Sequence, residues 1–209
     1  MLFLAGIAGP GWAGDAWVAD YRIRDARGEH SLVLVREDAR VEYRMEGEPP
    51  RVWRQTPDGV ELLELYPADS RMIAYAPGDL RTLNRLPDWS QLTGMVDPVL
   101  RTRLAAAGGA EAFAQPVIRY RGADAQSQPV ELDWLNDAGL PFRYCAGKHC
   151  DGKRHPATDA IHLQDLKRIP AENAFTSLEG LLEIDYADLG DMESDAFVRK
   201  LMSASQAAH

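Results

Sequence analysis

The chain has 209 residues, 45% of them hydrophobic and 26% charged, a composition that is typical of a globular protein and excludes a disordered polymer. Its length is sufficient for one domain. The net charge of −9 and the isoelectric point near 5.0 argue against nucleic acid or an anionic membrane surface as the main partner.

Residues 1–14 resemble part of a secretory signal peptide. They are apolar and small, no charge precedes Asp15, and Gly11 and Ala13 stand at the −3 and −1 positions of a cleavage site. The basic residues that open a signal peptide are missing, and the alternative is a buried N-terminal strand or helix. We expect a soluble protein exported to the periplasm, with 1–14 as a signal-peptide remnant and 15–209 as a single domain.

Six strand-like runs with turns between them follow, and this is the pattern of an antiparallel meander. Val41, Tyr43 and Met45 alternate with charged residues and are expected to face inward. The central hairpin joins 60–66 to 72–75 through a linker rich in turn formers. Because 60–66 is apolar on both sides, we expect this strand to lie between two packed surfaces.

The middle of the chain has a helical pattern. Asp88 is expected to cap a first helix, and Pro98 to break it and to begin a second helix over 99–107, which Gly108 and Gly109 end. Both helices are expected to pack on the sheet. The apolar stripe of the first helix consists of Trp89, Leu92, Met95 and Val96.

Strand patterns then resume, and an acidic segment leads into a short C-terminal helix. The later strands are expected over residues 117–121, 130–135, 140–144, 161–169 and 181–186, and the helix over 196–202.

This order resembles the LolA/LolB superfamily of periplasmic lipoprotein carriers, and the likeness covers roughly residues 17–175. It implies a mainly β (α+β) fold, namely an antiparallel half-barrel or curved sheet of about ten strands with a mid-chain helical lid and a short C-terminal helix. The matching motifs are Asp58-Gly59, Leu65-Tyr66-Pro67, the strand 72–75, the strand 131–135 followed by Gly139-Leu140-Pro141-Phe142-Arg143, and the strand 163–170 with Phe175.

The two cysteines, Cys145 and Cys150, predict a disulfide, because a close, even pair in an exported protein is normally oxidised. A ring of this size stabilises the fold by about 2 kcal/mol. The alternative is a metal-binding protein that uses the region from Cys145 to His162, with His149, His155 and His162 as further ligands.

The acidic segment 185–195 is expected to be a solvated loop in which an Asp or Ser194 caps the last helix. A calcium site is the alternative, although the segment lacks the alternating ligands and central glycine of an EF-hand loop.

No motif of a nucleophilic, metal-dependent or phosphate-binding enzyme occurs, so we expect a binding protein that is not an enzyme and that carries no cofactor. Apolar residues of the sheet and lid are expected to line a cavity for an acyl chain, a lipid or a lipidated peptide. The expected partners are therefore a hydrophobic small molecule or a lipidated protein, together with a membrane protein. A periplasmic regulatory or protein-interaction module on the same fold is the alternative. The candidate ligand-binding residues are Trp53, Leu63, Leu65, Ile73, Tyr75, Trp89, Leu92, Met95 and Trp134.

Overall fold

The computed structural model describes residues 14–26, 28–147, 150 and 159–207 of the chain. The expected signal peptide therefore lies outside the described residues, except for Gly14. The strands are β1 (Asp15–Asp25), β2 (Gly28–Arg36), β3 (Arg40–Met45), β4 (Arg51–Thr56), β5 (Gly59–Tyr66), β6 (Arg71–Tyr75), β7 (Ala105–Ala112), β8 (Gln115–Ala123), β9 (Pro129–Leu135), β10 (Leu140–Ala146), β11 (Asp159–Pro170) and β12 (Leu182–Asp185).

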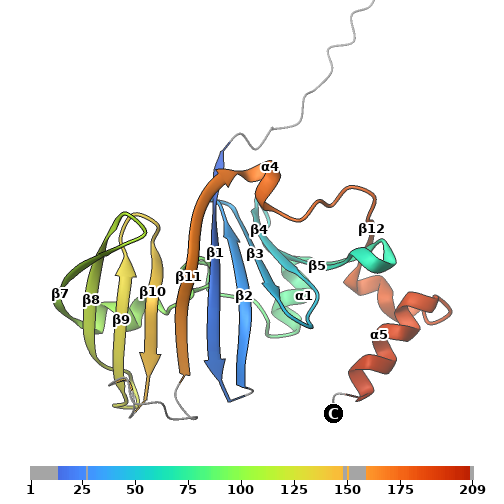
Figure 1. Ribbon diagram of the computed structural model, residues 1–209. Coiled ribbons are helices and arrows are strands. Elements are labelled where there is room, and N and C mark those ends of the chain that lie inside the picture. The colour runs from blue at the N-terminus through green and yellow to red at the C-terminus, as the bar shows by residue number, and fades with distance from the viewer. Residues whose placement is uncertain (1–13, 27, 148–149, 151–158, 208–209) are drawn as a thin grey trace, which may run out of the picture.

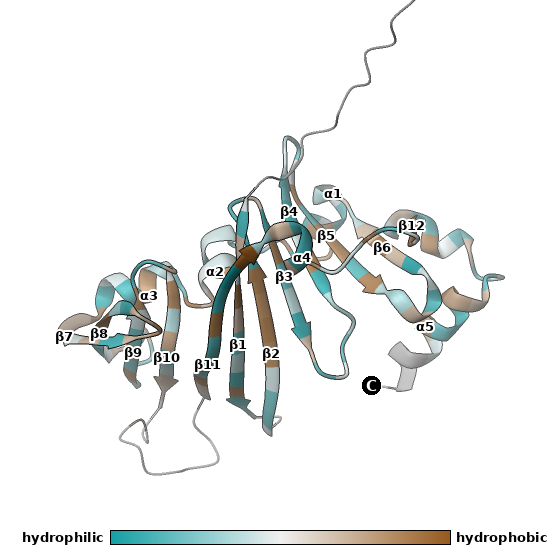
Figure 2. Cartoon of the chain, turned by 45° about the horizontal axis from the view of Figure 1, so that its top comes forward, coloured by the Kyte–Doolittle hydropathy of each residue, from teal (hydrophilic) through white to brown (hydrophobic). Residues whose placement is uncertain are grey.

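These strands form one 12-stranded sheet in the order β12-β6-β5-β4-β3-β2-β1-β11-β10-β9-β8-β7. Figure 1 shows it as an open, curved layer, so the mainly β fold with a curved sheet is confirmed. Strands β1 to β6 are the expected meander of antiparallel neighbours. Figure 2 shows hydrophobic and hydrophilic residues alternating along several strands, as expected for a sheet with distinct faces.

The two faces of the sheet are both packed. One face, called the lid face because the helix that contains Leu92 is hydrogen-bonded to Tyr43 on it, carries Tyr21, Leu34 and Leu62 in the largest hydrophobic cluster. The outer face carries Leu63 and Leu65, which are fully buried in a separate cluster with Val52 and Met72 from the neighbouring strands. The expectation that the central hairpin lies between two packed surfaces is therefore confirmed.

Three short helices follow β6, namely α1 (Pro77–Thr82), α2 (Trp89–Gly94) and α3 (Pro98–Arg103). The side chain of Asp88 accepts a hydrogen bond from the Gln91 amide, which confirms it as the cap of α2. Pro98 begins α3, as expected. The expectation that this second helix extends to residue 107 was wrong, because the small residues after Arg103 pair with β8 and form the edge strand β7. Gly108 stands there at φ +116, a conformation that favours glycine.

The C-terminal part of the chain adds a strand that was expected to be antiparallel but is parallel. After β11 come α4 (Ala171–Ala174), β12, the 3-10 helix η2 (Tyr186–Asp191) and α5 (Ala196–Ala207), and β12 pairs in parallel with β6. A parallel pair requires a long crossover, and here residues 76–181, about half of the chain, lie between its two strands. The buried carboxylate of Glu42 anchors this crossover on the outer face by accepting hydrogen bonds from the amide (2.9 Å) and hydroxyl (2.5 Å) of Thr176.

The helix α5 is longer than the expected 196–202 and begins after Asp195, whose carboxylate accepts from the Phe197 amide at 2.7 Å. The expected capping of this helix by an Asp of the acidic segment is thus confirmed. Asp195 Oδ2 also lies 3.7 Å from Nη2 of Arg71 at the start of β6, and Phe197 packs edge-on against Tyr66. The C-terminal segment therefore covers the β6 edge of the sheet, as Figure 1 shows. Among the described residues, no helix is long and apolar enough to cross a membrane.

Candidate ligand-binding groove

An open groove lies between α2 and the lid face of the sheet. It consists of two adjoining cavities of about 390 Å³ and about 230 Å³, which share Tyr43, Met45 and Leu92 as walls. The first extends over β1 and β2 and the second over β4. The remaining lining residues are Ile23, Leu32, Pro87, Asp88, Gln91 and Met95 in the first cavity and Glu48, Pro49, Arg51 and Trp53 in the second.

The groove runs across the strands rather than along them. The lining residues that belong to strands come from β1, β2, β3 and β4, which are consecutive neighbours in the sheet. Neighbouring strands lie about 4.8 Å apart, so the three gaps between four strands give a length of about 14 Å. The floor is thus a row of side chains that point to the same face of four strands.

Two hydrogen bonds attach the C-terminal end of α2 to the sheet. Tyr43 on β3 donates to the carbonyl oxygen of Leu92, and Arg36 on β2 donates to that of Thr93 at 2.7 Å. The last carbonyls of a helix have no partner within the helix, so these donors satisfy groups that would otherwise be unpaired. Burial lowers the pKa of Arg36 and raises that of Tyr43. The lid is therefore held at this end, and the groove lies beside the attachment.

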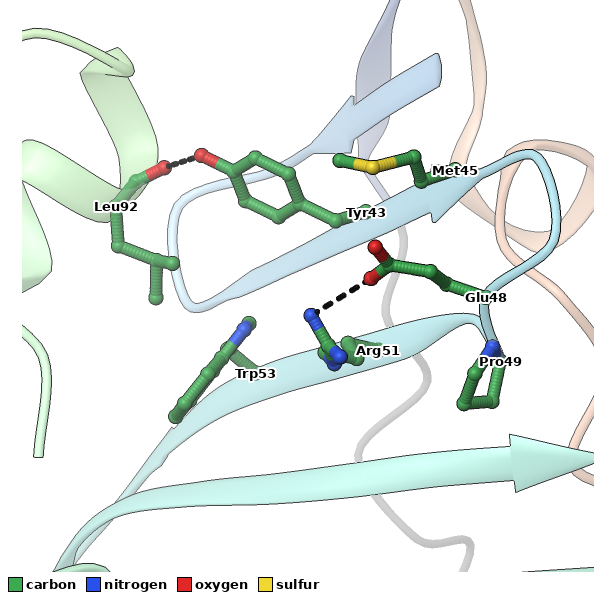
Figure 3. A pocket seen from close by; sticks show the side chains of 7 residues that line it. All are labelled: Tyr43, Met45, Glu48, Pro49, Arg51, Trp53 and Leu92. Atoms are coloured by element: carbon green, nitrogen blue, oxygen red, sulfur yellow. Dashed lines mark hydrogen bonds and ion pairs between the residues drawn. The ribbon is translucent and has the colours of Figure 1, made fainter. Parts of the chain in front are cut away.

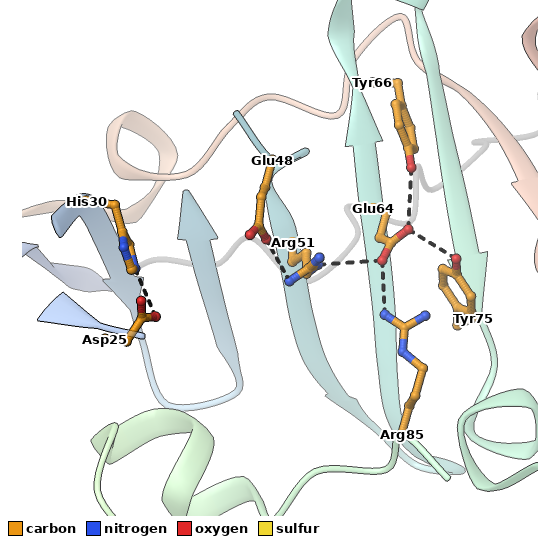
Figure 4. A network of polar contacts seen from close by, with 8 residues as sticks. All are labelled: Asp25, His30, Glu48, Arg51, Glu64, Tyr66, Tyr75 and Arg85. Atoms are coloured by element: carbon orange, nitrogen blue, oxygen red, sulfur yellow. Dashed lines mark hydrogen bonds and ion pairs between the residues drawn. The ribbon is translucent and has the colours of Figure 1, made fainter. Parts of the chain in front are cut away.

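The groove ends at the polar side chains of Glu48, in the turn between β3 and β4, and of Arg51 on β4. Arg51 lies between Trp53 and Glu48 in the close view of the groove, and its Nη1 is 3.1 Å from a Glu48 carboxylate oxygen (Figure 3). Arg51 Nε is 3.5 Å from the mostly buried carboxylate of Glu64. Glu64 also accepts from Arg85 Nη2 at 3.0 Å (Figure 4). Two carboxylates and two guanidinium groups thus form one network.

Tyrosines complete this network on the side away from the groove. Tyr75 donates to Glu64 at 3.0 Å, and burial together with the Glu64 charge raises the pKa of Tyr75. Burial and the same carboxylate raise the pKa of Tyr66 to about 12. Tyr186 of η2 stacks on Tyr75 at 4.7 Å between ring centroids. The C-terminal segment therefore closes the lid face beyond the polar end of the groove.

The nine residues expected to bind ligand lie in four places. Trp53, Leu92 and Met95 line the groove. The other six do not line it: Ile73, Tyr75 and Trp89 belong to the main cluster of the lid face, Leu63 and Leu65 lie on the outer face, and Trp134 packs in a separate cluster with Val96 and Leu104.

Several lining residues were not among those nine. Tyr43 and Met45 were expected to face inward from the alternation in their strand, and this signal would have found them. Ile23 shares a face with Trp17 and Tyr21 in the same way. Arg51 had no comparable signal, because an arginine between apolar neighbours is normally a solvated residue.

Cys145 and Cys150 are joined by a disulfide, with their Cα atoms 5.5 Å apart, so the predicted bond is present. Two of the histidines considered as metal ligands, His149 and His155, lie outside the described residues. His162 packs edge-on against Phe142. In the part of the chain that the structure describes, no three potential metal ligands cluster.

No protein-family model and no curated protein matches the sequence. Among solved structures, an uncharacterized conserved protein from Thermus thermophilus is 11% identical over 83% of this chain and 91% of its own, with a TM-score of 0.48. The MucA/MucB complex of Pseudomonas aeruginosa includes a chain that is 13% identical over 81% of this chain and 58% of its own, with a TM-score of 0.44.

A LolA superfamily protein from Nitrosomonas europaea is 12% identical over 81% of this chain and 92% of its own, with a TM-score of 0.28. The solved structures thus include a member of the superfamily that the sequence motifs resemble. The likeness is in the fold alone. This chain spans less than two thirds of the matched chain of the MucA/MucB complex.

Proposed function

We propose that this protein binds one acyl chain, as part of a lipid or a lipidated peptide, without covalent chemistry. The observation that carries the proposal is the open groove on the lid face. Most of that face is filled by core side chains, whereas the part over β1 to β4 leaves cavities of about 390 Å³ and about 230 Å³ with largely apolar walls. Pockets for small ligands have this composition and a similar volume.

The length of the groove supports an acyl chain as occupant. The hydrocarbon core of a bilayer is about 30 Å thick and holds two layers of chains, so one chain extends for about 15 Å. The groove crosses four strands, a distance of about 14 Å. Each methylene removed from water contributes about 0.8 kcal/mol, so a chain that fills the groove has a sufficient driving force.

We place this activity in the periplasm. The sequence of residues 1–14 and the Cys145–Cys150 disulfide both support export, because disulfides persist in oxidising compartments. A chain shielded in a groove can be moved through water between two membranes, and this would make the protein a carrier. N-terminal sequencing of the fractionated protein should find a start near Gly14. A cytoplasmic protein that begins at Met1 would contradict the export.

Mass spectrometry of molecules extracted with the protein, purified from the periplasm without detergent, tests the binding. We expect about one acyl-containing molecule per chain. Leu92→Arg places a charge in both cavities and should abolish this signal, while the same substitution at Val99, an exposed residue of α3 outside the groove, should retain it. An empty groove in the parent protein, together with a stably bound protein, would contradict the carrier and favour an interaction module.

A further inference from the structure

The charges along the groove bear on the chemistry of the bound molecule. Three side chains that carry a charge near neutral pH line it, namely Glu48, Arg51 and Asp88. Asp88 is ionised, because hydrogen bonds from Ser90 and from the Gln91 amide lower its pKa. The lining therefore contains two carboxylates and one guanidinium group. This surplus of negative charge disfavours an anionic ligand.

At the polar end, the lining side chains with N–H donors are Arg51 and Trp53, and those of Arg51 are the charged ones. A guanidinium group has five N–H donors. Its Nη1 contacts Glu48 at 3.1 Å, whereas its Nε, 3.5 Å from Glu64, is buried and forms no hydrogen bond with the described residues. The side chain is 38% exposed and lies next to Trp53 in the wall of the groove (Figure 3). An acceptor at this end of an acyl chain can therefore reach it.

The charge of Arg51 is already balanced. Arg51 and Arg85 face the carboxylates of Glu48 and Glu64, so the network has no net charge. A free carboxylate on the ligand would be a third anion beside two guanidinium groups in a partly buried site, and it would have no cation of its own. A carbonyl oxygen adds no charge and still accepts a hydrogen bond from a charged donor.

We infer that the groove selects an acyl chain whose polar end is uncharged, the carbonyl of an ester or an amide, and that Arg51 donates to this carbonyl. This inference rests on the proposed function. The head of the ligand lies over β4, and the chain extends across β3 and β2 toward Ile23 on β1. A free fatty acid, which has the same chain and an anionic head, is a poor ligand.

Two probes with the same chain, 1-dodecanoylglycerol and dodecanoate at pH 8, test the inference by displacing a fluorescent hydrophobic dye from the groove. The parent protein should bind the ester at least tenfold more tightly than the carboxylate. Glu48→Gln removes one negative charge and should strengthen dodecanoate binding several-fold, with the affinity for the ester changed by less than twofold. Arg51→Gln should weaken ester binding about tenfold, the usual effect of losing a hydrogen bond to a charged group.

Arg54→Gln is the matched control, because Arg54 lies on the same strand, is paired with Glu61 at 2.7 Å and does not line the groove. It should leave both affinities unchanged. Dodecanoate binding as tightly as the ester, or equal effects of Arg51→Gln and Arg54→Gln, would overturn the inference and leave the proposed function standing. If neither probe binds the parent protein, both the inference and the proposed function fail. If Arg51→Gln does not fold, the affinity of Glu48→Gln for dodecanoate still tests the inference, and unchanged dodecanoate binding by this variant would overturn it.

Discussion

The stability of Leu92→Ala tests whether Leu92 lines a ligand groove or belongs to the ordinary hydrophobic core. Leu92 is half-buried and lines both cavities, so its truncation enlarges a space that is already open and creates no sealed void. Full burial of a leucine contributes about 1.5–3 kcal/mol, and half of it is therefore about 1 kcal/mol. Leu62, fully buried on the same face, is the comparison, because truncation of such a residue costs about 2–5 kcal/mol.

For ligand affinity the order of the two variants should be reversed: Leu92→Ala should weaken binding more than Leu62→Ala does. Leu92 would contact the acyl chain over several methylenes, so we expect Leu92→Ala to weaken binding of 1-dodecanoylglycerol by about 1–2 kcal/mol, or roughly five- to thirtyfold. Leu62→Ala should change the affinity by less than twofold under conditions where it is folded. Urea unfolding and dye displacement measure the two quantities. A Leu92→Ala variant that is as destabilised as Leu62→Ala, with unchanged binding, would refute the reasoning.

Three further predictions concern how the fold is held. Cys145→Ser should lower the free energy of unfolding by about 2 kcal/mol with no effect on dye displacement, and a larger loss in urea unfolding would mean that the disulfide holds more than its loop. Glu42→Gln should cost about 1–3 kcal/mol, because it weakens the charged anchor of Thr176, and proteolysis should then cut the crossover to β12 faster; unchanged cleavage would argue against the anchor. Tyr43→Phe removes the donor to the Leu92 carbonyl and should cost about 1 kcal/mol, with faster hydrogen exchange in α2 but not in β9 as the check.

Local patterns were sufficient for much of the fold. The alternation in β3, the turn formers between β5 and β6, and the Asp88 cap act within a few residues, and each gave the correct element. The same local rules failed at Ala105–Ala112, where the alanines favour a helix over a strand. Pairing with β8 determines that they are a strand, and this partner is specified by tertiary structure.

The groove depends on contacts that sequence spacing does not contain. Trp53, Leu92 and Met95 line it, whereas Trp89, on the same helical stripe as Leu92, packs against the same cluster and does not line the groove. The position of Arg51 beside Glu64 depends on the register between β4 and β5. Such polar networks across strands are found only when the register is known.

Photocrosslinking tests the central claim most directly. A dodecanoyl glycerol ester with a photoreactive diazirine at the end of its chain is bound to the purified protein, irradiated, and mapped by peptide mass spectrometry. The proposed site predicts labels on groove residues, above all Ile23, Leu32 and Met95, at one probe per chain, and their loss in Leu92→Arg. Labels confined to the outer face or to the edge strand β7, and retained in Leu92→Arg, would contradict it.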